Sequence, residues 1–354
     1  MLDGDMTSHH GMNQLSLSSP SEWQFYAKGN ANAIYRYEGD EEQLRGKVLR
    51  LRLHKPSVNY ASTEEIFAFA RDKCEVHFPN NCIRSELVNL DVDFISRLGK
   101  DGFRLLTSEK FGILMDDILD GDYSTHELSK HCKLHVQHKC GLEAGRVASV
   151  ILELKPKWLY DNCHNYCRNC SLGQQRNFDR HFCPLDLTSK NTLIRGVDDL
   201  LSRVPSHIAD FTSENCQFKL RSLLYNYLLE PENVFQKLKN LQRLEDDGDR
   251  ICNIRRLEDI SDALLFAMTM RDVGVFMKFE KLITEESDFV QLECMFRELD
   301  STVLDDKEPY AVTISLYDFD LKLREKFEYW KKTDMTIREY YDSYNSEWPF
   351  CAKG

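Results

Sequence analysis

Apolar and polar residues alternate along the first part of the chain in the way that β-strands require. The alternation covers residues 22–28, 33–37 and 47–53, and a glycine-containing turn at 28–32 separates the first two segments. Because successive strand side chains point to opposite faces of a sheet, this pattern predicts three strands that each bury one face. Residues 1–20 show no such period, and we expect a flexible N-terminal tail there.

A helix and a further strand complete this region. The sequence Ser-Thr-Glu-Glu at 62–65 is a capping box, which favours a helix beginning there. Residues 111–117 begin with an apolar run and end in Asp116 and Asp117, which is typical of a buried strand that leaves the core at an acidic hinge. The pattern therefore predicts a small, β-rich, nucleotide-clamping lobe over residues 21–117.

Helical periodicity dominates the rest of the chain. Helices are predicted at 192–204, 218–229, 232–244 and 257–270, with closing helices at 322–332 and 337–344. Strands are predicted at 147–154, 273–279 and 311–317. The acidic segment 285–308 separates the last two strands as an insertion. We therefore expect an α+β fold whose larger, mixed helical C-terminal lobe covers residues 118–354.

The composition narrows the class of protein. The 354 residues carry a net charge of −12, and a chain that coats nucleic acid needs a broad positive surface instead. No apolar run approaches the roughly 20 residues that cross a bilayer, and the first 20 residues lack the apolar core of a signal peptide. We expect a soluble intracellular monomer, in the nucleus and cytoplasm, that binds neither membranes nor nucleic acid directly.

Two aspartates flank the last pair of predicted strands. Asp272 comes just before the first of them, and Asp318 ends the second within Asp318-Phe319-Asp320. In kinase-type phosphoryl transfer one carboxylate handles the acceptor hydroxyl and another holds Mg²⁺. Acids on either side of a hairpin emerge at one edge, so this pair is a candidate catalytic site. Aspartate is also common at strand ends, and an ordinary structural role is the alternative.

Two basic features are candidate phosphate ligands. Lys155-Pro156-Lys157 follows a predicted strand, and the proline fixes the chain so that both ammonium groups project at a defined place. Gly29 lies in the first turn, where backbone N–H groups can approach phosphates, and Arg50 on the third strand would neutralise them. The alternatives are a solvated strand end and an ordinary hairpin.

Four of the 12 cysteines gather within 21 residues. His164, Cys167, Cys170 and Cys183 have the spacing His-x2-Cys-x2-Cys-x12-Cys of a tetrahedral structural zinc site. Cys163 is an alternative fourth ligand, and buried thiols or a redox pair are the alternatives to zinc.

A second cluster of potential ligands has less regular spacing, and we interpret it as a polar loop. Its members are His131, Cys132, His135, His138 and Cys140.

The order of these motifs along the chain resembles the inositol-pentakisphosphate 2-kinase family. The family's Glu-(Ile/Leu)-Lys-Pro-Lys matches residues 153–157, and its Cys-Arg-x-Cys and Cys-Pro-Leu-Asp-Leu match 167–170 and 183–187. Its Thr-x-(Lys/Arg)-Asp matches 269–272, and its Asp-x-Asp-Leu-Lys matches 318–322. The resemblance runs from about Trp23 to Tyr341.

The resemblance implies a two-lobed fold distantly like that of protein kinases, with ATP and Mg²⁺ bound between the lobes. It implies transfer of the γ-phosphoryl group to the axial 2-hydroxyl of inositol 1,3,4,5,6-pentakisphosphate, which gives inositol hexakisphosphate, or phytate. The zinc site would be architectural.

The resemblance also assigns roles to residues. Catalytic roles fall to Asp318, Asp272 and Lys155. Nucleotide binding falls to Gly29, Asn32, Arg50, Asp116, Asp117 and Asp318, and magnesium to Asp318 and Asp320. Inositol-phosphate binding falls to Lys155, Lys157, Gln217, Lys219, Lys332, Arg338 and Tyr341.

The chain departs from the family pattern at three places. Ala27 replaces the first glycine of the turn, residues 215–219 replace Asn-Asn-Phe-Arg, and Leu323 replaces a proline. The alternative function is a non-catalytic zinc-containing module that holds RNA or an acidic partner on the Lys-Pro-Lys turn. That alternative accounts for the Cys/His set but not for the paired aspartates.

Overall fold

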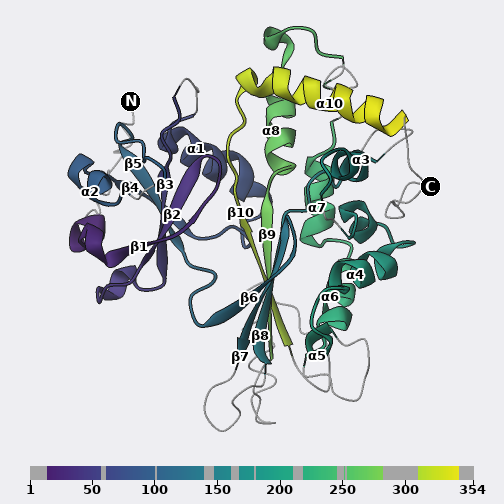
Figure 1. Ribbon diagram of the computed structural model, residues 1–354, viewed down its shortest axis with the longest axis horizontal. Helices are drawn as coiled ribbons and strands as arrows, with labels where there is room; N and C mark the ends of the chain where they lie inside the picture. The colour runs from purple at the N-terminus through teal and green to yellow at the C-terminus, as the bar shows by residue number, and fades with distance from the viewer. Residues whose placement is uncertain are drawn as a thin grey trace, which may run out of the picture. The chain divides into compact units, whose positions relative to one another are not determined.

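The computed structural model describes residues 14–56, 61–99, 102–138, 147–160, 167–178, 181–209, 218–244, 251, 253–281 and 310–342. The chain forms two compact units, which Figure 1 shows. The N-terminal unit comprises Met1–Asp72 and Ile83–Asp120, and the C-terminal unit comprises Lys73–Cys82 and Gly121–Gly354. Residues 73–82, which the sequence pattern leaves inside the first lobe, group with the second unit.

The N-terminal unit contains a five-stranded antiparallel sheet of order β1-β2-β3-β5-β4. Its strands are β1 (Trp23–Lys28), β2 (Asn32–Tyr37), β3 (Lys47–Arg52), β4 (Ser85–Asn89) and β5 (Phe111–Asp116). The helices are α1 (Thr63–Phe69) and α2 (Val92–Arg97). The predicted strands and the capping box are confirmed: Ser62 accepts from the Glu65 backbone, and Glu65 accepts from the Ser62 backbone in return.

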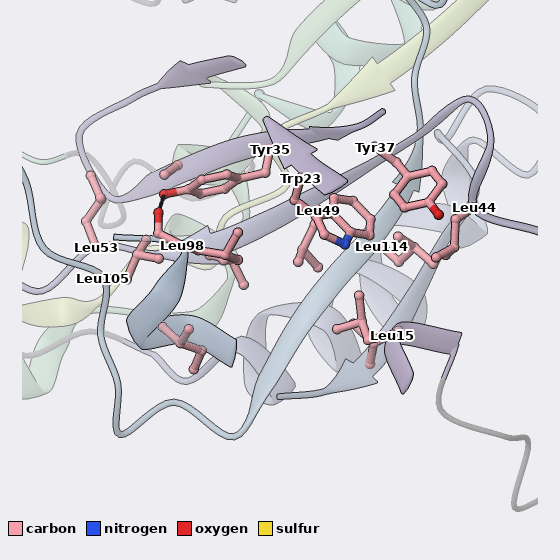
Figure 2. Packing of buried hydrophobic residues seen from close by; sticks show 14 residues of the cluster. Leu15, Trp23, Tyr35, Tyr37, Leu44, Leu49, Leu53, Leu98, Leu105 and Leu114 are labelled. Carbon is pink, nitrogen blue, oxygen red and sulfur yellow. Dashed lines mark hydrogen bonds between the residues drawn. The ribbon is translucent and has the colours of Figure 1, made fainter. Parts of the chain in front are cut away.

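One face of this sheet carries the core of the N-terminal unit. Figure 2 shows leucines and aromatic rings packed there, with the Tyr35 hydroxyl donating to the Leu98 carbonyl oxygen at 2.8 Å. Burial raises the pKa of Tyr35 to about 12, so the hydroxyl stays a donor at any physiological pH.

The expectation of a flexible tail over residues 1–20 is wrong for residues 14–20. Residues Gln14–Leu17 form a short 3₁₀ helix, and Leu15 is buried in the core that Figure 2 shows. The Trp23 indole N–H also donates to the Ser18 hydroxyl at 2.9 Å. A single anchoring leucine has no periodicity, so the sequence pattern could not reveal it. Residues 1–13 lie outside the described part of the chain.

The C-terminal unit contains a second antiparallel sheet, of order β10-β9-β8-β7-β6. Its strands are β6 (Tyr123–Ser129), β7 (Cys132–His138), β8 (Val147–Leu154), β9 (Gly274–Lys281) and β10 (Tyr310–Tyr317). The central strand β8 is almost wholly buried, and the predicted pairing of β9 with β10 is confirmed. The acidic segment 285–308 lies outside the described residues.

The interpretation of the His131–Cys140 region as a polar loop is wrong. Residues 123–138 form the β6–β7 hairpin, with His131 in its turn and His135 almost fully buried in β7. Polar residues such as Lys133 and His135 alternate with Leu134 and Val136, which face the core, so the polar positions obscured the strand pattern. Cys140 lies outside the described residues.

Helices gather beside the second sheet, as Figure 1 shows. They are α3 (Arg168–Gln175), α4 (Leu193–Leu201), α5 (Ser206–Ala209), α6 (Leu220–Leu229), α7 (Val234–Leu241), α8 (Asp262–Met270) and α10 (Phe327–Asp342). The four helices predicted between 192 and 270 are present as α4, α6, α7 and α8. The described residues contain no helix that is both long enough and apolar enough to span a membrane.

The two predicted closing helices are one helix, α10, which is a correction. Phe327 and Trp330 of α10 are buried in a cluster with residues of α8. The hydroxyls of Thr333 and Thr336 donate to the carbonyl oxygens four residues earlier in α10. Because these polar groups are satisfied inside the helix, residues 333–336 continue it instead of ending it.

The segment Lys73–Cys82 covers the edge of β10. The Leu316 backbone N–H donates to the Asn81 carbonyl oxygen at 2.6 Å, and Cys82 forms a parallel bridge with Leu316. Phe78 is fully buried, with its ring centroid 6.4 Å from that of Phe319. This contact supports the chain immediately beyond β10, where Asp318 and Asp320 lie.

Candidate active site

Strand ends bring Lys155 and Asp318 together in the C-terminal unit. Lys155 follows β8 and Asp318 follows β10, and both strands pair with β9. The Lys155 ammonium group and the Asp318 carboxylate form an ion pair in which each side chain is about three-quarters buried. Although burial lowers it, the pKa of Lys155 is raised by Asp318, so the ammonium group stays charged.

A second ion-pair group lies on the neighbouring strand. Asp272, just before β9, accepts from Lys157 Nζ through Oδ1 and from Lys322 Nζ through Oδ2, each at 2.6 Å. Burial raises the pKa of Asp272, but the two ammonium groups outweigh this effect and hold it well below its usual range. The structure thus pairs the predicted lysines with the predicted aspartates. It adds Lys322, which belongs to the Asp-x-Asp-Leu-Lys motif but had no predicted role.

The backbone at Asp318 is unusual for a residue other than glycine, because its φ is +70°. Such a conformation costs of order 1 kcal/mol or more and persists where neighbouring contacts enforce it. On one side of it Phe319 is buried, and the Thr269 hydroxyl donates to the Asp320 carbonyl oxygen at 3.2 Å. Strain of this kind often marks a functional site.

The turn that carries Lys157 is held by Trp158. The Trp158 ring contacts two guanidinium groups, with Arg168 Cζ 3.8 Å and Arg271 Cζ 4.2 Å from the ring centroid. The Asn169 side-chain amide donates to the Trp158 carbonyl oxygen at 3.0 Å. Because Arg168 and Asn169 begin α3, this helix fixes the position of the turn.

Two further cations lie near this turn and were not predicted. Arg176 donates to the Tyr329 hydroxyl at 3.1 Å, and both Arg176 and Lys157 lower the pKa of Tyr329. Lys130 Nζ lies 3.7 Å, and Arg176 Cζ 5.9 Å, from the centroid of the Phe178 ring. The only sequence signal for Arg176 was its place one residue beyond the helix of the Cys-Arg-x-Cys motif.

Other predicted inositol-phosphate ligands lie on helices instead of at the strand ends. Lys219 is the N-cap of α6, Lys332 is exposed on α10, and Arg338 of α10 pairs with Asp334 at 3.1 Å. Gln217 lies outside the described residues.

Tyr341 is another predicted ligand, and its backbone belongs to α10. Its side chain is outside the described part of the structure.

In the N-terminal unit the predicted nucleotide residues lie on β2, β3 and the turn before β2. The Gly29 N–H donates to the Asn32 carbonyl oxygen at 2.9 Å, and a Cβ at Gly29 would meet nothing within 4 Å. Arg52, which sequence reasoning passed over, donates to Asn32 Oδ1 at 3.1 Å and to the Ala61 carbonyl oxygen at 3.2 Å. Arg50 is half-buried and lies on the same face of β3 as Arg52.

The acidic residues at the end of β5 form ion pairs within the same unit. Lys47 pairs with Asp116 at 2.5 Å, and Arg36 pairs with Asp117 at 2.6 Å. Asp117 also accepts from the Leu119 backbone N–H at 2.9 Å, which shapes the turn that follows. These contacts give both carboxylates a structural role, and their contact with nucleotide stays a prediction.

Three of the predicted zinc ligands converge. The Sγ atoms of Cys167, Cys170 and Cys183 lie within 4.8 Å of one another, and all three residues are buried. Cys167 and Cys183 Sγ are 3.7 Å apart, which is far longer than a disulfide. Zn–S bonds of about 2.3 Å in a tetrahedron place two sulfurs about 3.8 Å apart, so this geometry fits zinc. His164 and Cys163 lie outside the described residues.

Comparison with known proteins decides the family. The inositol-pentakisphosphate 2-kinase profile matches residues 25–336, which is most of the chain. The chain belongs to the inositol-pentakisphosphate 2-kinase family.

Three relatives carry that family's name. A Debaryomyces hansenii inositol-pentakisphosphate 2-kinase is 37% identical over 95% of this chain and 96% of its own length. The Saccharomyces cerevisiae protein is 25% identical over 88% of this chain and 94% of its own length. The Yarrowia lipolytica protein is 28% identical over 51% of this chain and 59% of its own length.

The family match confirms the resemblance that the motifs carry, and it covers residues of both units. The matched range contains Arg50, Lys155, Asp272 and Asp318 together with the cysteine cluster. Arg338 and Tyr341 lie beyond it.

The Asp272 ion pairs lead to a prediction about stability. Asp272→Asn should lower the free energy of unfolding by about 2 kcal/mol at pH 7, because two ammonium groups lose their shared carboxylate. The folded-state pKa of Asp272 lies below the unfolded value of about 3.9, so its contribution is complete above about pH 4 and is lost as the pH falls through the folded value. Urea denaturation at pH 7, 5 and 3 measures this difference, which should shrink only at pH 3.

Asp259→Asn is the matched control for this prediction. Asp259 forms a solvent-exposed ion pair with Arg256, so the change should leave the unfolding free energy nearly unaltered. Equal stabilities of wild type and Asp272→Asn at pH 7 would contradict the assigned role.

Proposed function

We propose that this protein is an ATP-dependent kinase that phosphorylates the 2-hydroxyl of inositol 1,3,4,5,6-pentakisphosphate and yields inositol hexakisphosphate. The observation that carries the proposal is the Lys155–Asp318 pair beyond the ends of β8 and β10, beside Lys157, Asp272 and Lys322. This arrangement occurs in a chain that matches the inositol-pentakisphosphate 2-kinase family over residues 25–336.

The acceptor carries five phosphates, so its site must concentrate positive charge in a protein of net charge −12. Lys155, Lys157 and Lys322 already lie at the strand ends, and Arg176 and Lys130 lie beside them around Phe178. Without acceptor, Asp272 and Asp318 neutralise these lysines. Phosphate oxygens of the acceptor would compete with the carboxylates for the same ammonium groups.

Chemistry at the reacting hydroxyl is assigned to Asp318 and Lys155. Asp318 accepts the hydrogen bond of the 2-hydroxyl and takes its proton as the new O–P bond forms, while the bond from the γ-phosphorus to the bridging oxygen breaks and ADP leaves. Lys155 stabilises negative charge on the phosphoryl group in transit. Asp318 and Asp320 offer the carboxylate oxygens that Mg²⁺ prefers, and Mg²⁺ would supply further charge neutralisation when bound.

We assign nucleotide binding to the N-terminal unit. Gly29 leaves open space at its turn, Arg52 holds Asn32, and Arg50 lies on the same face of β3. An open glycine turn beside arginines suits the approach of phosphates to backbone N–H groups.

The alternative of a non-catalytic RNA-binding or partner-binding module has less support. It gives no reason for Asp318 to be held at a positive φ beside Lys155. Location in the nucleus and cytoplasm and the monomeric state stay predictions.

A transfer assay tests the function. Wild-type protein with labelled ATP, Mg²⁺ and inositol 1,3,4,5,6-pentakisphosphate should yield labelled inositol hexakisphosphate. Asp318→Asn should lower kcat by a thousandfold or more with the fold intact, because the carboxylate acts on the reacting atoms. Loss of less than about tenfold, or about 1.4 kcal/mol of barrier, would show that Asp318 is not the catalytic carboxylate. A wild-type protein that forms no labelled product refutes the function.

Binding experiments separate the acceptor residues from the nucleotide residues. Lys155→Ala and Lys157→Ala should each weaken inositol-phosphate binding at least tenfold more than ATP binding, and Arg50→Ala should do the reverse. The loss should shrink as salt rises, since screening already weakens these contacts. Calorimetric titration of both ligands decides this, with the exposed Lys190→Ala as the charge-matched control. Lysine variants that lose ATP and keep the inositol phosphate would reverse the assignment.

We also propose that Cys167, Cys170 and Cys183 bind one structural Zn²⁺ with His164, or with Cys163 in its place. Protein purified without chelators should contain about one zinc per chain by elemental analysis. Cys170→Ser should release the metal and lower the thermal midpoint, because a closed site contributes folding energy. Cys132→Ser, at a buried cysteine outside the cluster, should keep the metal. Absence of zinc from the wild type refutes the site.

A further inference from the structure

A chain of polar side chains crosses the second sheet and ends beside the Lys155–Asp318 pair. The Tyr317 hydroxyl donates to Glu153 Oε1 at 2.8 Å, and His135 Nε2 lies 3.1 Å from Glu153 Oε2. His135 Nδ1 lies 2.8 Å from the Thr125 hydroxyl. These residues belong to β10, β8, β7 and β6, so the chain connects strands across the whole sheet.

Two members of this chain, Tyr317 and Glu153, are close neighbours of the candidate active residues in the sequence. Tyr317 immediately precedes Asp318, and Glu153 lies two residues before Lys155. The hydrogen bond between Tyr317 and Glu153 therefore joins the ends of β10 and β8 at the place where the ion pair forms.

The Tyr317 side chain reaches β8 only because β9 makes room for it. Gly274 of β9 pairs directly with Tyr317, and a Cβ at Gly274 would lie 2.1 Å from Tyr317 Cζ. The φ of Gly274 is not in the left-handed region, so its backbone does not demand glycine. The need for glycine at this position comes from the tyrosine ring.

The Tyr317 ring is held on its faces as well. It stacks on Phe276 with ring centroids 4.7 Å apart, and Lys155 Nζ lies 5.3 Å from its centroid. Burial and the Glu153 charge raise the pKa of Tyr317 well above its usual range, which keeps the hydroxyl a donor. Because the Tyr317 ring is fixed in this way, it constrains both the Lys155 ammonium group that lies over it and Asp318, the residue of positive φ that follows it.

We propose that Tyr317 is a positioning residue for phosphoryl transfer, and that its hydrogen bond to Glu153 sets the relative placement of Lys155 and Asp318. The inference rests on the proposed kinase function and adds residues for which the family motifs imply no role. It follows from the sensitivity of transfer to placement, because an error of about 1 Å can cost a hundredfold in rate.

The first test is Tyr317→Phe, which removes one oxygen and keeps the ring. We expect kcat to fall at least tenfold, or about 1.4 kcal/mol of barrier, with KM for both substrates changed less than threefold. Tyr123→Phe is the matched control, because it removes a hydroxyl that contacts Ser149 in the same sheet, and it should keep full kcat. A merely structural role would lower the thermal midpoint of Tyr317→Phe and leave the kcat of the folded fraction unchanged, which would overturn the proposal.

Variants of Glu153 decide whether the hydrogen bond itself matters. Glu153→Gln keeps an oxygen that accepts from Tyr317, and His135 can change tautomer because the Thr125 hydroxyl both donates and accepts. We expect Glu153→Gln to stay within threefold of wild-type kcat and Glu153→Ala to match Tyr317→Phe. The double variant Tyr317→Phe/Glu153→Ala should be no slower than either single variant, since both remove one interaction. Additive losses would overturn the proposal.

Crystal structures give a readout that does not depend on activity. The Lys155–Asp318 ion pair should be closed in the wild type and in Tyr123→Phe, and opened in Tyr317→Phe. An unchanged pair in Tyr317→Phe refutes the positioning role even if the wild type transfers no phosphoryl group. Inactivity of the wild type alone refutes the kinase function and leaves this structural test decisive.

Discussion

The repulsion between the lysines gathered beside the ends of β8 and β10 is an electrostatic constraint on this part of the C-terminal unit. Two ammonium groups about 5 Å apart repel by about 3 kcal/mol at an effective dielectric constant of about 20. The Asp272 carboxylate offsets this repulsion because it accepts hydrogen bonds from both Lys157 and Lys322. Asp318 forms the corresponding ion pair with Lys155. The carboxylates thereby hold the three cations in place at this edge of the sheet.

The placement of these charges depends on elements from distant parts of the sequence. The β8–β9–β10 ladder sets the strand ends, and the segment Lys73–Cys82 covers the outer edge of β10. Trp158, whose ring contacts Arg168 and Arg271, fixes the turn that carries Lys157. Arg168 lies between two of the clustered cysteines, so a metal there would support the same turn.

In the N-terminal unit the two faces of the sheet differ in their packing. Trp23 and Leu15 are buried on one face of its sheet. The other face is mixed, because Val48 is buried there and Arg52 donates a hydrogen bond to Asn32 on the same face. The packed core thus supports the strands from one side, while the opposite face combines apolar and arginine side chains.

Local patterns in the sequence were enough to predict the strands and helices with a clear period. Alternation revealed β1, β2 and β3, and helical spacing revealed α4, α6, α7 and α8. The same patterns missed the β6–β7 hairpin, because polar residues occupy many of its positions, and they split α10 at Thr333 and Thr336. They also missed the anchoring role of Leu15, since a single buried leucine leaves no periodic signal.

The sequence by itself also determined the family and the residues with reactive side chains, because Lys155, Lys157, Asp272 and Asp318 belong to short motifs. Only the tertiary structure decided which of them meet: Lys155 with Asp318 and Lys157 with Asp272, with Lys322 as an added partner. Each partner of Lys155 and Lys157 is more than 100 positions away along the chain. Motif spacing describes neighbours within a segment, whereas these contacts depend on strand order and register, which arise only when the whole sheet packs.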